Sequence, residues 1–237
     1  MYKILPLFFI FLAIVRTGTA QNSASDLVES GKKKQAKGAA ESAIKEYTKA
    51  IELDKNLTDA YYFRGNAWFD LEEFQKAADD YSSAINLQPE YKDALFNRGN
   101  AYYELEKYDM AVKDFSRSIA LDPGYADDWF SRGNAFFKLG RYQEALDDFN
   151  KGISLNNANA DAYYDRANTH YNLRNFESAI ADYTKAIELQ EGTFDFYFNR
   201  ALAYFSLNMD DKACEDLAKA EELGDPEAKE YIRELCK

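Results

Sequence analysis

The sequence predicts an all-α protein: a right-handed superhelical solenoid of six helix-turn-helix (34-residue) repeats plus a C-terminal capping helix. The first observation is the quartet RGNA at residues 64–67, 98–101 and 132–135, which returns as RANT at 166–169 and RALA at 200–203. Each copy begins 34 residues after the one before it. The second observation is that apolar residues three and four apart form one stripe along each expected helix. The third is that small and large residues recur at fixed places, as in helices that interlock.

The unit of residues 126–159 shows the repeated pattern most completely. Its small and aromatic residues stand at unit positions 4, 8, 11, 20 and 24, and they are Trp129, Gly133, Phe136, Ala145 and Phe149. This pattern resembles the tetratricopeptide repeat, which reads W-x2-L-G-x2-Y, then A-x3-F, then P. The resemblance covers residues 24–225 and implies helical hairpins stacked around a concave inner face. The expected units are 24–57, 58–91, 92–125, 126–159, 160–193 and 194–225, within a repeat domain of residues 21–237.

The fixed small and large residues explain why each unit is expected to be a pair of packed helices. Position 20 is Ala in all six units, position 8 is Gly or Ala, and position 24 is Tyr, Phe or Leu. A large side chain over a small residue lets two helices approach closely. Pro89 and Pro123 close two units, where proline would end a helix. Because one hairpin cannot bury its apolar side alone, the hairpins are expected to stack.

The two ends of the array depart from the pattern. In the first unit Lys34 replaces the aromatic ring at position 11, which predicts an N-terminal capping unit whose outer face is exposed to solvent. After the sixth unit, residues 226–237 predict a capping helix, because apolar residues fall on one helical stripe and Pro226 suits a first turn. That stripe consists of Ala228, Tyr231, Ile232, Leu235 and Cys236.

The two cysteines of the chain, Cys214 and Cys236, are expected to form a disulfide. They lie 11 residues before and 11 residues after Asp225, where an antiparallel helical hairpin would turn. Residues equidistant from such a turn lie opposite each other, and an exported chain meets an oxidising compartment. The alternative is that both thiols are small core residues, since position 21 is apolar in every other unit.

Residues 1–20 are expected to be a secretory signal peptide that is cleaved after Ala20. They have a basic start at Lys3, an apolar run of 12 residues, and the small residues Gly18 and Ala20 at the −3 and −1 positions. The run is shorter than the roughly 20 residues of a membrane-spanning helix. An uncleaved anchor and a mitochondrial presequence are the alternatives. We therefore expect a periplasmic or extracellular protein with no membrane span in its mature chain.

The charge of the chain argues against nucleic acid as a partner. The sequence has 41 Asp and Glu against 29 Lys and Arg, a net charge of −12. Loss of residues 1–20 would remove two more basic residues, Lys3 and Arg16. An acidic surface repels a phosphate backbone.

The arginine of the quartet stands at position 7, beside the core stripe, and therefore requires a partner. The second helix of each unit supplies an aspartate at position 23, on the side that faces the packing. The first unit lacks both residues, with Ser30 and Glu46 in their places. We expect five structural ion pairs, within or between units, and consider an anion site the less favoured alternative. The residues are Arg64, Arg98, Arg132, Arg166 and Arg200, and Asp80, Asp114, Asp148, Asp182 and Asp216.

The asparagine of the quartet stands at position 9, roughly 200° from the arginine around the helix. In tetratricopeptide arrays this face lines the concave groove, and the row is similar to the asparagine ladder of the O-linked N-acetylglucosamine transferase repeats. Side-chain amides can both donate to and accept from a peptide backbone, and neighbouring rings supply contact area. The alternative is that the rings pack on one another. The expected groove residues are Asn66, Asn100, Asn134 and Asn168, with Tyr62, Phe96, Phe130, Tyr164, Phe69, Tyr103, Phe137 and Tyr171.

One ligand known for the family is not expected. Chaperone-binding tetratricopeptide domains clamp a C-terminal carboxylate with lysines at positions 2 and 5 and asparagines at positions 6 and 9. Asn66 and Asn97 match two of these places, but Tyr62, Asp93 and Asp127 stand where the lysines should be. An anionic tail would meet carboxylates there, so we expect no carboxylate clamp.

No catalytic residue, cofactor or metal site is expected. The single histidine, His170, stands at position 11, where other full units carry an aromatic ring, so a packed core histidine is the expectation. Zinc sites built on two or three histidines are impossible with one. No Gly-rich phosphate loop is present.

These observations predict a non-catalytic protein–protein interaction scaffold that binds an extended peptide or protein segment in its concave groove. Two alternatives remain open. One is a structural protein that self-associates through its ends or its acidic face. The other is a non-catalytic regulatory subunit of a cell-envelope enzyme complex.

Overall fold

The computed structural model describes residues 23–236, so the expected signal peptide at 1–20 lies outside the described residues. The described part consists of thirteen α-helices and contains no strand. The helices are α1 Ala24–Gln35, α2 Ala40–Leu53, α3 Thr58–Asp70, α4 Phe74–Leu87, α5 Lys92–Glu104, α6 Tyr108–Leu121, α7 Ala126–Lys138, α8 Tyr142–Leu155, α9 Ala160–Asn172, α10 Phe176–Leu189, α11 Phe194–Ser206, α12 Asp210–Glu222 and α13 Ala228–Leu235.

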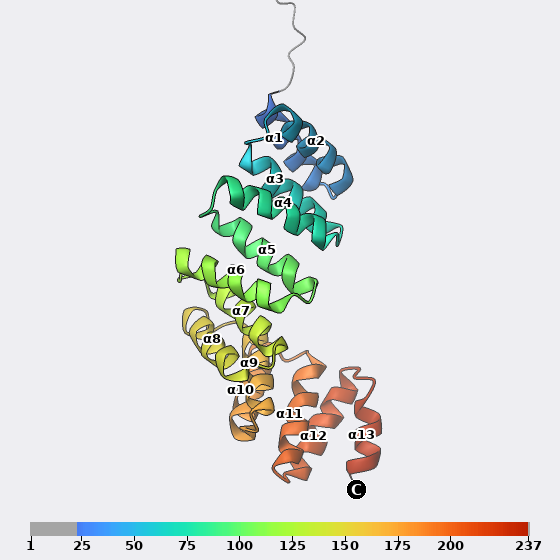
Figure 1. Cartoon of the computed structure of the whole chain (residues 1–237). Helices are drawn as coiled ribbons and strands as arrows, with labels where there is room; N and C mark the ends of the chain where they lie inside the picture. The colour runs from blue at the N-terminus through green and yellow to red at the C-terminus, as the bar shows by residue number, and fades with distance from the viewer. Residues whose placement is uncertain (1–22, 237) are drawn as a thin grey trace, which may run out of the picture.

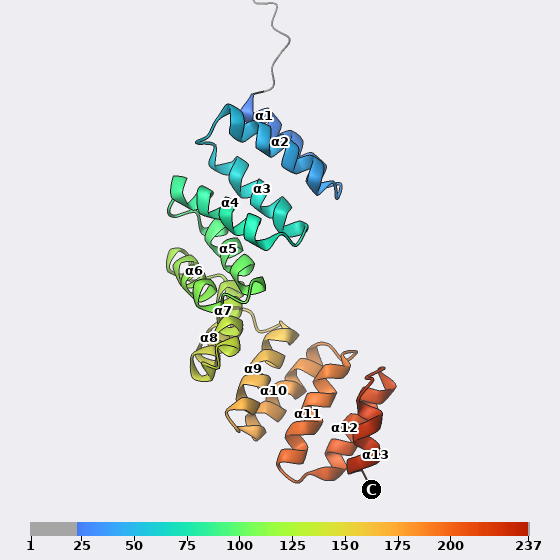
Figure 2. The same ribbon diagram turned by 45° about the vertical axis from the view of Figure 1, so that its right-hand side comes forward.

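The helices pair and stack in chain order, which makes the right-handed solenoid that the sequence predicts. Every odd-numbered helix from α1 to α11 begins 34 residues after the preceding one. Each helix packs mainly against its neighbours in sequence, and the first helices of successive units also touch. Figures 1 and 2 show the pairs along one curved path from α1 to α13. Because contacts stay local, the core is a series of small clusters that continue from unit to unit.

Glycine at position 8 sets the spacing of the two helices in the first four units. A Cβ placed on Gly65 would lie 2.7 Å from the ring of Tyr81, and one on Gly99 would lie 2.6 Å from Phe115. A real side chain does not tolerate such contacts, so the ring of the second helix rests directly on the backbone of the first. The fifth and sixth units carry Ala167 and Ala201 there, and both are fully buried.

The turn inside each unit requires a left-handed residue at position 15. Gly38 and Gly140 adopt it at φ 75° and 71°. In the other units φ lies between 56° and 61° at Glu72, Glu106, Arg174 and Asn208. Non-glycine residues adopt this conformation at a cost, so the stacked helices on either side hold these turns in place.

Both ends of the helical array are capped, and the bounds of the C-terminal capping helix differ from the prediction. Lys34 pairs with Glu46 at 2.7 Å and so substitutes for the missing arginine pair in the first unit. The C-terminal helix is shorter than the expected 226–237, because Pro226 lies in a turn ahead of it. The carboxylate of Asp225 accepts the backbone N–H of Glu227 at 2.7 Å and thereby forms that turn. A disulfide joins Cys214 of α12 to Cys236, with their Cα atoms 5.7 Å apart.

Candidate peptide-binding groove

The arginine row lies inside the stack and has the same geometry in five units. Each guanidinium donates from Nε and Nη2 to the two carboxylate oxygens of the aspartate 16 residues later, at 2.6–2.7 Å. The aspartates are between 4% and 7% exposed. The five pairs are Arg64–Asp80, Arg98–Asp114, Arg132–Asp148, Arg166–Asp182 and Arg200–Asp216.

Each arginine also joins its own unit to the preceding one. Its Nη1 donates to the polar side chain at position 25 of the unit before, at 2.8–3.1 Å. These acceptors are Thr48, Ser82, Ser116, Asn150 and Thr184. Burial raises the pKa of Asp80 and Asp148 even beside a guanidinium. The charge of each of these five arginines is therefore paired within the stack, which argues against an anion site built on them.

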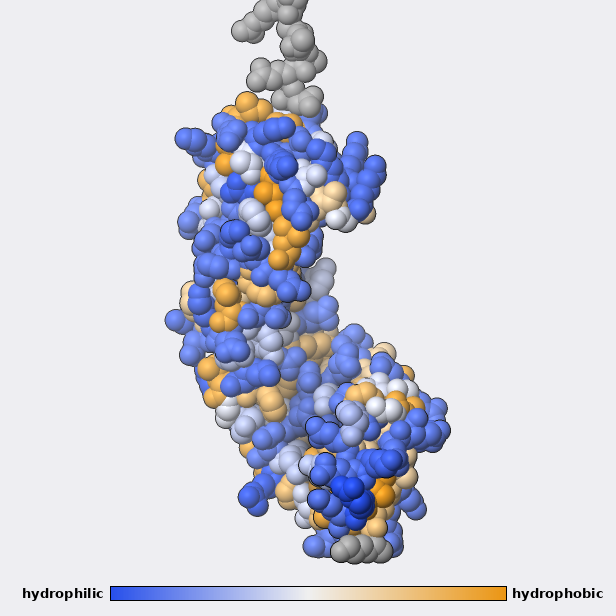
Figure 3. Space-filling view, turned by 90° about the vertical axis from the view of Figure 1, so that its right-hand side faces the viewer, coloured by the Kyte–Doolittle hydropathy of each residue, from blue (hydrophilic) through white to orange (hydrophobic). Residues whose placement is uncertain are grey.

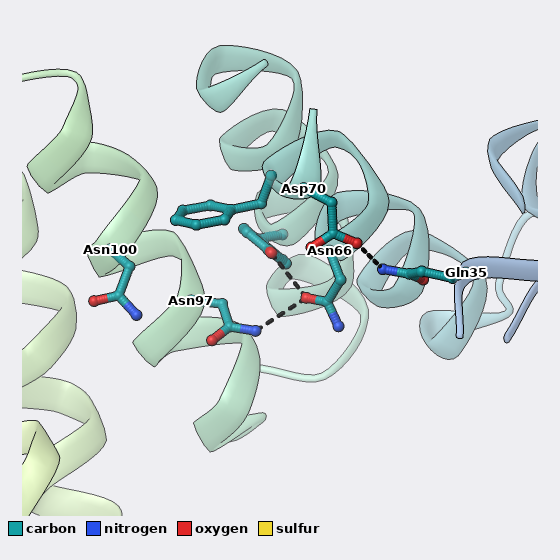
Figure 4. Close-up of a pocket in the computed structure, with 7 residues that line it drawn as sticks. Gln35, Asn66, Asp70, Asn97 and Asn100 are labelled. Carbon is teal, nitrogen blue, oxygen red and sulfur yellow. Dashed lines mark hydrogen bonds between the residues drawn. The ribbon is translucent and has the colours of Figure 1, made fainter. Parts of the chain in front are cut away.

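The asparagine row differs between units, and units two and five form one type. In unit two the Oδ1 of Asn66 accepts from the Tyr81 hydroxyl at 2.8 Å and from Nδ2 of Asn97 at 3.0 Å. Figure 4 shows these two contacts converging on the oxygen of Asn66. In unit five the Oδ1 of Asn168 accepts from the Tyr183 hydroxyl at 2.6 Å. A carbonyl oxygen has two lone pairs, so Asn66 retains only its N–H groups for a ligand.

Units three and four form the second type, in which phenylalanine replaces the tyrosine at position 24. Phe115 and Phe149 have no hydroxyl to offer to the asparagine of their unit. Asn100 forms no hydrogen bond to the other residues drawn in Figure 4, and it lies across a cavity from Asn66. Asn134 lies beside the carboxyl group of Asp165. The middle of the groove therefore has the two amides of this row that are not held by a tyrosine.

The rings beside the asparagines are more engaged than the sequence suggests. Those at position 12 pack edge to face on the first residue of the next helix, with centroids 5.1–5.4 Å apart. Those at position 5 pack on the position-24 ring in units two, three and five. Phe130 is 7% exposed and its ring lies where a Cβ on Gly152 would be. Phe130 is therefore a core residue, and its place in the expected groove is wrong.

Two cavities follow the asparagine row. One, of about 310 Å³, is lined by Asn66, Asn97, Asn100 and the ring of Phe69, among others. The next, of about 200 Å³, is lined by Asn100, Asn134, Ser131 and Tyr103. Seen from one side in Figure 3, the surface is hollowed about midway along the molecule, and most of the residues there are hydrophilic. The groove thus offers polar cavities with aromatic walls.

Position 6, which the sequence analysis considered only for the carboxylate clamp, was left out of the expected groove residues. Asn97 and Asn199 occupy it in units three and six, and each donates to the tyrosine hydroxyl at position 5 of the preceding unit. The N···O distances are 3.3 Å to Tyr62 and 3.0 Å to Tyr164. The signal was present in the sequence, because position 6 is Asn only where the preceding unit has tyrosine at position 5.

Unit five has a carboxylate at position 6. Asp165 stands at position 6, and the residue at position 5 of the preceding unit is Phe130, which has no hydroxyl. Burial raises the pKa of Asp165 to about 6, and the nearby amide of Asn134 offsets only part of that effect. No Lys, Arg or His nitrogen of residues 23–236 lies within 4.0 Å of the carboxylate.

Other chemistry-bearing residues of the sequence have structural surroundings. His170 is mostly buried, burial lowers its pKa, and its Nε2 lies 3.9 Å from Asp182. In the described part of the chain, no group of three or more His, Cys, Asp or Glu is placed to hold a metal ion. No helix between residues 23 and 236 has both the length and the apolar character needed to cross a bilayer.

A curved stack of helical hairpins with a polar and aromatic inner face defines a class: the α-solenoid scaffolds, which bind other proteins. Family comparison gives the particular family. The description "TPR repeat" matches residues 65–106 and 133–173. "Tetratricopeptide repeat" matches 93–125, 160–192 and 194–223. Together these cover more than half of the chain, and the chain belongs to the tetratricopeptide repeat family. No curated protein sequence matches it.

Solved structures of the same fold accompany the family match. A crystal structure of MamA protein is 26% identical, with a TM-score of 0.67, over 73% of this chain and 94% of that one. A tetratricopeptide repeat protein from Parabacteroides merdae is 26% identical, with a TM-score of 0.63, over 90% and 82%. The structure of YrrB, described as a TPR protein with an unusual peptide-binding site, is similar in fold at 24% identity. Its TM-score is 0.69 over 80% of this chain and 98% of that one.

Proposed function

We propose that this chain is a non-catalytic scaffold that holds an extended peptide or protein segment in its concave groove. The observation that carries the proposal is the pair of amides at Asn100 and Asn134, which no tyrosine of their unit engages. Both line the same cavity of about 200 Å³, together with Tyr103 and Ser131. Each amide offers a donor and an acceptor, which is what an extended backbone requires.

The rest of the groove supports a peptide over a compact small molecule. The two cavities follow one another along the row of first helices and share Asn100 in their walls. An extended chain can place its backbone along such a row and its side chains in successive cavities. The rings of Phe69 and Tyr103 are partly exposed and supply apolar walls for those side chains.

The test compares two double variants of the same amide row. Peptides are selected on the purified protein from a random display library, and their affinities are measured by fluorescence anisotropy. Asn100→Ala with Asn134→Ala is expected to weaken binding by about tenfold or more, because two backbone contacts are lost. Asn66→Ala with Asn168→Ala should mainly lower the melting temperature, because it removes bonds to Tyr81 and Tyr183. Equal affinity of both variants and the wild type would exclude this groove as the binding site.

We also propose that the chain acts outside the cytosol. The expected signal peptide at residues 1–20 and the bridge between Cys214 and Cys236 support this, since disulfides persist in oxidising compartments. The measurement is thiol titration of the denatured, unreduced protein recovered from its native compartment. Two free thiols per chain would contradict both the bridge and the location.

Self-association is a second candidate, and one observation favours it. The last residue of the second helix is an exposed leucine in five successive units, between 38% and 51% exposed. This row runs along one edge of the solenoid and consists of Leu53, Leu87, Leu121, Leu155 and Leu189. Sizing at two concentrations tests it, with Leu87→Glu and Leu121→Glu as a variant expected to remain monomeric. A subunit role in an envelope enzyme complex would appear as co-purification in an unbiased pull-down.

A further inference from the structure

The larger of the two groove cavities, of about 310 Å³, lies where the first three units meet. Four of the seven residues that line it carry a side-chain amide, namely Gln35 of α1, Asn66 of α3, and Asn97 and Asn100 of α5. A fifth lining residue is the carboxylate Asp70 of α3. Position 12 is an aromatic ring in every other unit, so Gln35 gives this cavity a polar end that the rest of the row lacks.

Hydrogen bonds within the wall of this cavity decide which polar groups remain for a ligand. The Nδ2 of Asn97 donates to Oδ1 of Asn66 at 3.0 Å and to the Tyr62 hydroxyl at 3.3 Å, which uses both of its hydrogens. Its Oδ1 is thus left as an acceptor. Oδ1 of Asn66 accepts from Asn97 and from the Tyr81 hydroxyl, so its Nδ2 is left as a donor. Figure 4 shows Asn97 between Asn66 and Asn100.

The chain itself places one glutamine amide against the carboxylate of this wall. Oε1 of Gln35 accepts from the Tyr47 hydroxyl at 3.0 Å, and its Nε2 donates to Oδ2 of Asp70 at 2.6 Å. One primary amide therefore joins a donor and a carboxylate here. In Figure 4 the second oxygen of Asp70 lies on the side away from Gln35, and it is left as an acceptor.

The open groups of the wall combine donors and acceptors in one small space. Asn66 and Asp70 are four residues apart on α3, so the donor and the acceptor lie on one helix face. A ligand carboxylate would meet the charge of Asp70, and an ammonium or guanidinium group offers no acceptor to Asn66. An apolar side chain would leave all of these groups unpaired. A primary amide has an acceptor and a donor on the same carbon and matches both.

We propose that this cavity is a subsite for the side-chain amide of a glutamine or asparagine in the bound segment. This rests on the proposed function, because Asn100 lines both cavities and so places the bound backbone beside this one. The oxygen of the ligand amide accepts from the N–H groups of Asn66 and Asn100. Its nitrogen donates to Asp70 and Asn97, and the ring of Phe69 covers the methylene stem.

The test begins with peptides selected on the purified protein from a random display library, with affinities measured by fluorescence anisotropy. The selected peptides are expected to carry glutamine or asparagine at one fixed place. Replacement of that residue by the matching acid should weaken binding by about tenfold or more, because a donor is exchanged for a negative charge near Asp70. Replacement of a glutamine by methionine, which has a similar shape, should also weaken binding, since the polar groups of the wall lose their partner.

Asp70→Asn tests the protein side of the same contact. It keeps an oxygen for Gln35 but removes the charge, so the preference for the amide peptide over the acid peptide should fall by about tenfold. The variant is expected to fold, because Asp70 is exposed and ends α3, where the helix dipole disfavours a negative charge. The matched control is Glu104→Gln, which removes an exposed carboxylate at the same position of the next unit, in the wall of the smaller cavity. It should leave the preference unchanged.

The outcomes separate the subsite from the groove. Equal changes of preference in Asp70→Asn and Glu104→Gln would show general repulsion of acidic peptides and overturn the subsite. Selected peptides with a fixed basic residue, or with no fixed amide residue, would also overturn it. If Asn100→Ala with Asn134→Ala weakens binding while the amide and acid peptides bind equally well, the groove stands and the subsite falls. If neither that double variant nor Asp70→Asn changes binding, both proposals fall.

Discussion

The interior of the stack and its concave face use the same quartet in different ways. In the interior, all five arginines make the same bidentate pair and the same bond to the preceding unit. On the concave face, the asparagines divide into two types according to the residue at position 24. Asn66 and Asn168 are held by tyrosine hydroxyls, whereas Asn100 and Asn134 stand over Phe115 and Phe149.

The difference separates what every unit needs from what only some units need. Each interface between units must bury the same charges, so any unit that lost its pair would weaken the array. An inner-face amide has no such constraint, because water or a ligand can satisfy it. Variation of polar partners along a groove is therefore a better guide to a binding site than the repeated residue itself.

The largest expected effect comes from removing one of the five identical Arg–Asp pairs of the interior. Arg98→Leu should lower the free energy of unfolding by about 3–5 kcal/mol, since it leaves the buried Asp114 carboxylate unpaired. Urea denaturation followed by circular dichroism measures it. Arg98→Leu combined with Asp114→Leu should recover much of the loss. An unchanged melting temperature in the single variant would show that the pair does not support the stack.

The second effect concerns the acid of the concave face. The folded-state pKa of Asp165, about 6, lies above the ordinary aspartate value, so its ionisation opposes folding as pH rises from about 4 to 6. Asp165→Asn should therefore stabilise the protein by about 2 kcal/mol at pH 7.5 and by little at pH 4. Melting curves across this range decide it, with Asp127→Asn as the control that shows no such trend. A constant difference at all pH values would contradict a buried carboxylate.

The third effect interconverts the two types of unit. Phe115→Tyr adds the hydroxyl that unit two has in Tyr81, and it should engage the oxygen of Asn100. We expect about 1 kcal/mol of added stability together with weaker peptide binding. Tyr81→Phe is the reverse change and should cost about 1 kcal/mol, because Asn66 loses that donor. Thermal melting should therefore show a higher melting temperature for Phe115→Tyr and a lower one for Tyr81→Phe. Shifts in the same direction would show that the tyrosine hydroxyl does not distinguish the two types of unit.

The smallest effect tests the one histidine of the interior. Burial lowers the pKa of His170, so the unfolded chain takes up the proton more readily, and stability is lost as pH falls below about 6.5. Its Nδ1 also has no hydrogen-bond partner. His170→Phe restores the ring found in Phe136 and should raise stability more at pH 5 than at pH 7.5. Equal gains at both pH values would show that protonation is not involved.

The 34-residue period was sufficient to predict the architecture. Helix type, pairing and the ring over a small residue follow from side chains spaced three and four apart, and these are local properties of the chain. The starts of the paired helices follow the same period in the structure. The C-terminal helix was less well predicted, because the aspartate turn at Asp225 forms ahead of it and Pro226 falls in that turn.

The sequence alone determined the repeat, the phase of each helix and the residues that face inward. Residues three or four apart lie on the same face of a helix, so their spacing is enough to predict which of them face inward. Only the tertiary structure decided which inward residues are free. Whether Asn66 is engaged depends on Tyr81 from the second helix and Asn97 from the next unit. Whether Phe130 is accessible depends on the space above Gly152. Hydrogen bonds and close packing are set by distances between helices, and a periodic sequence repeats the residue without repeating its neighbours.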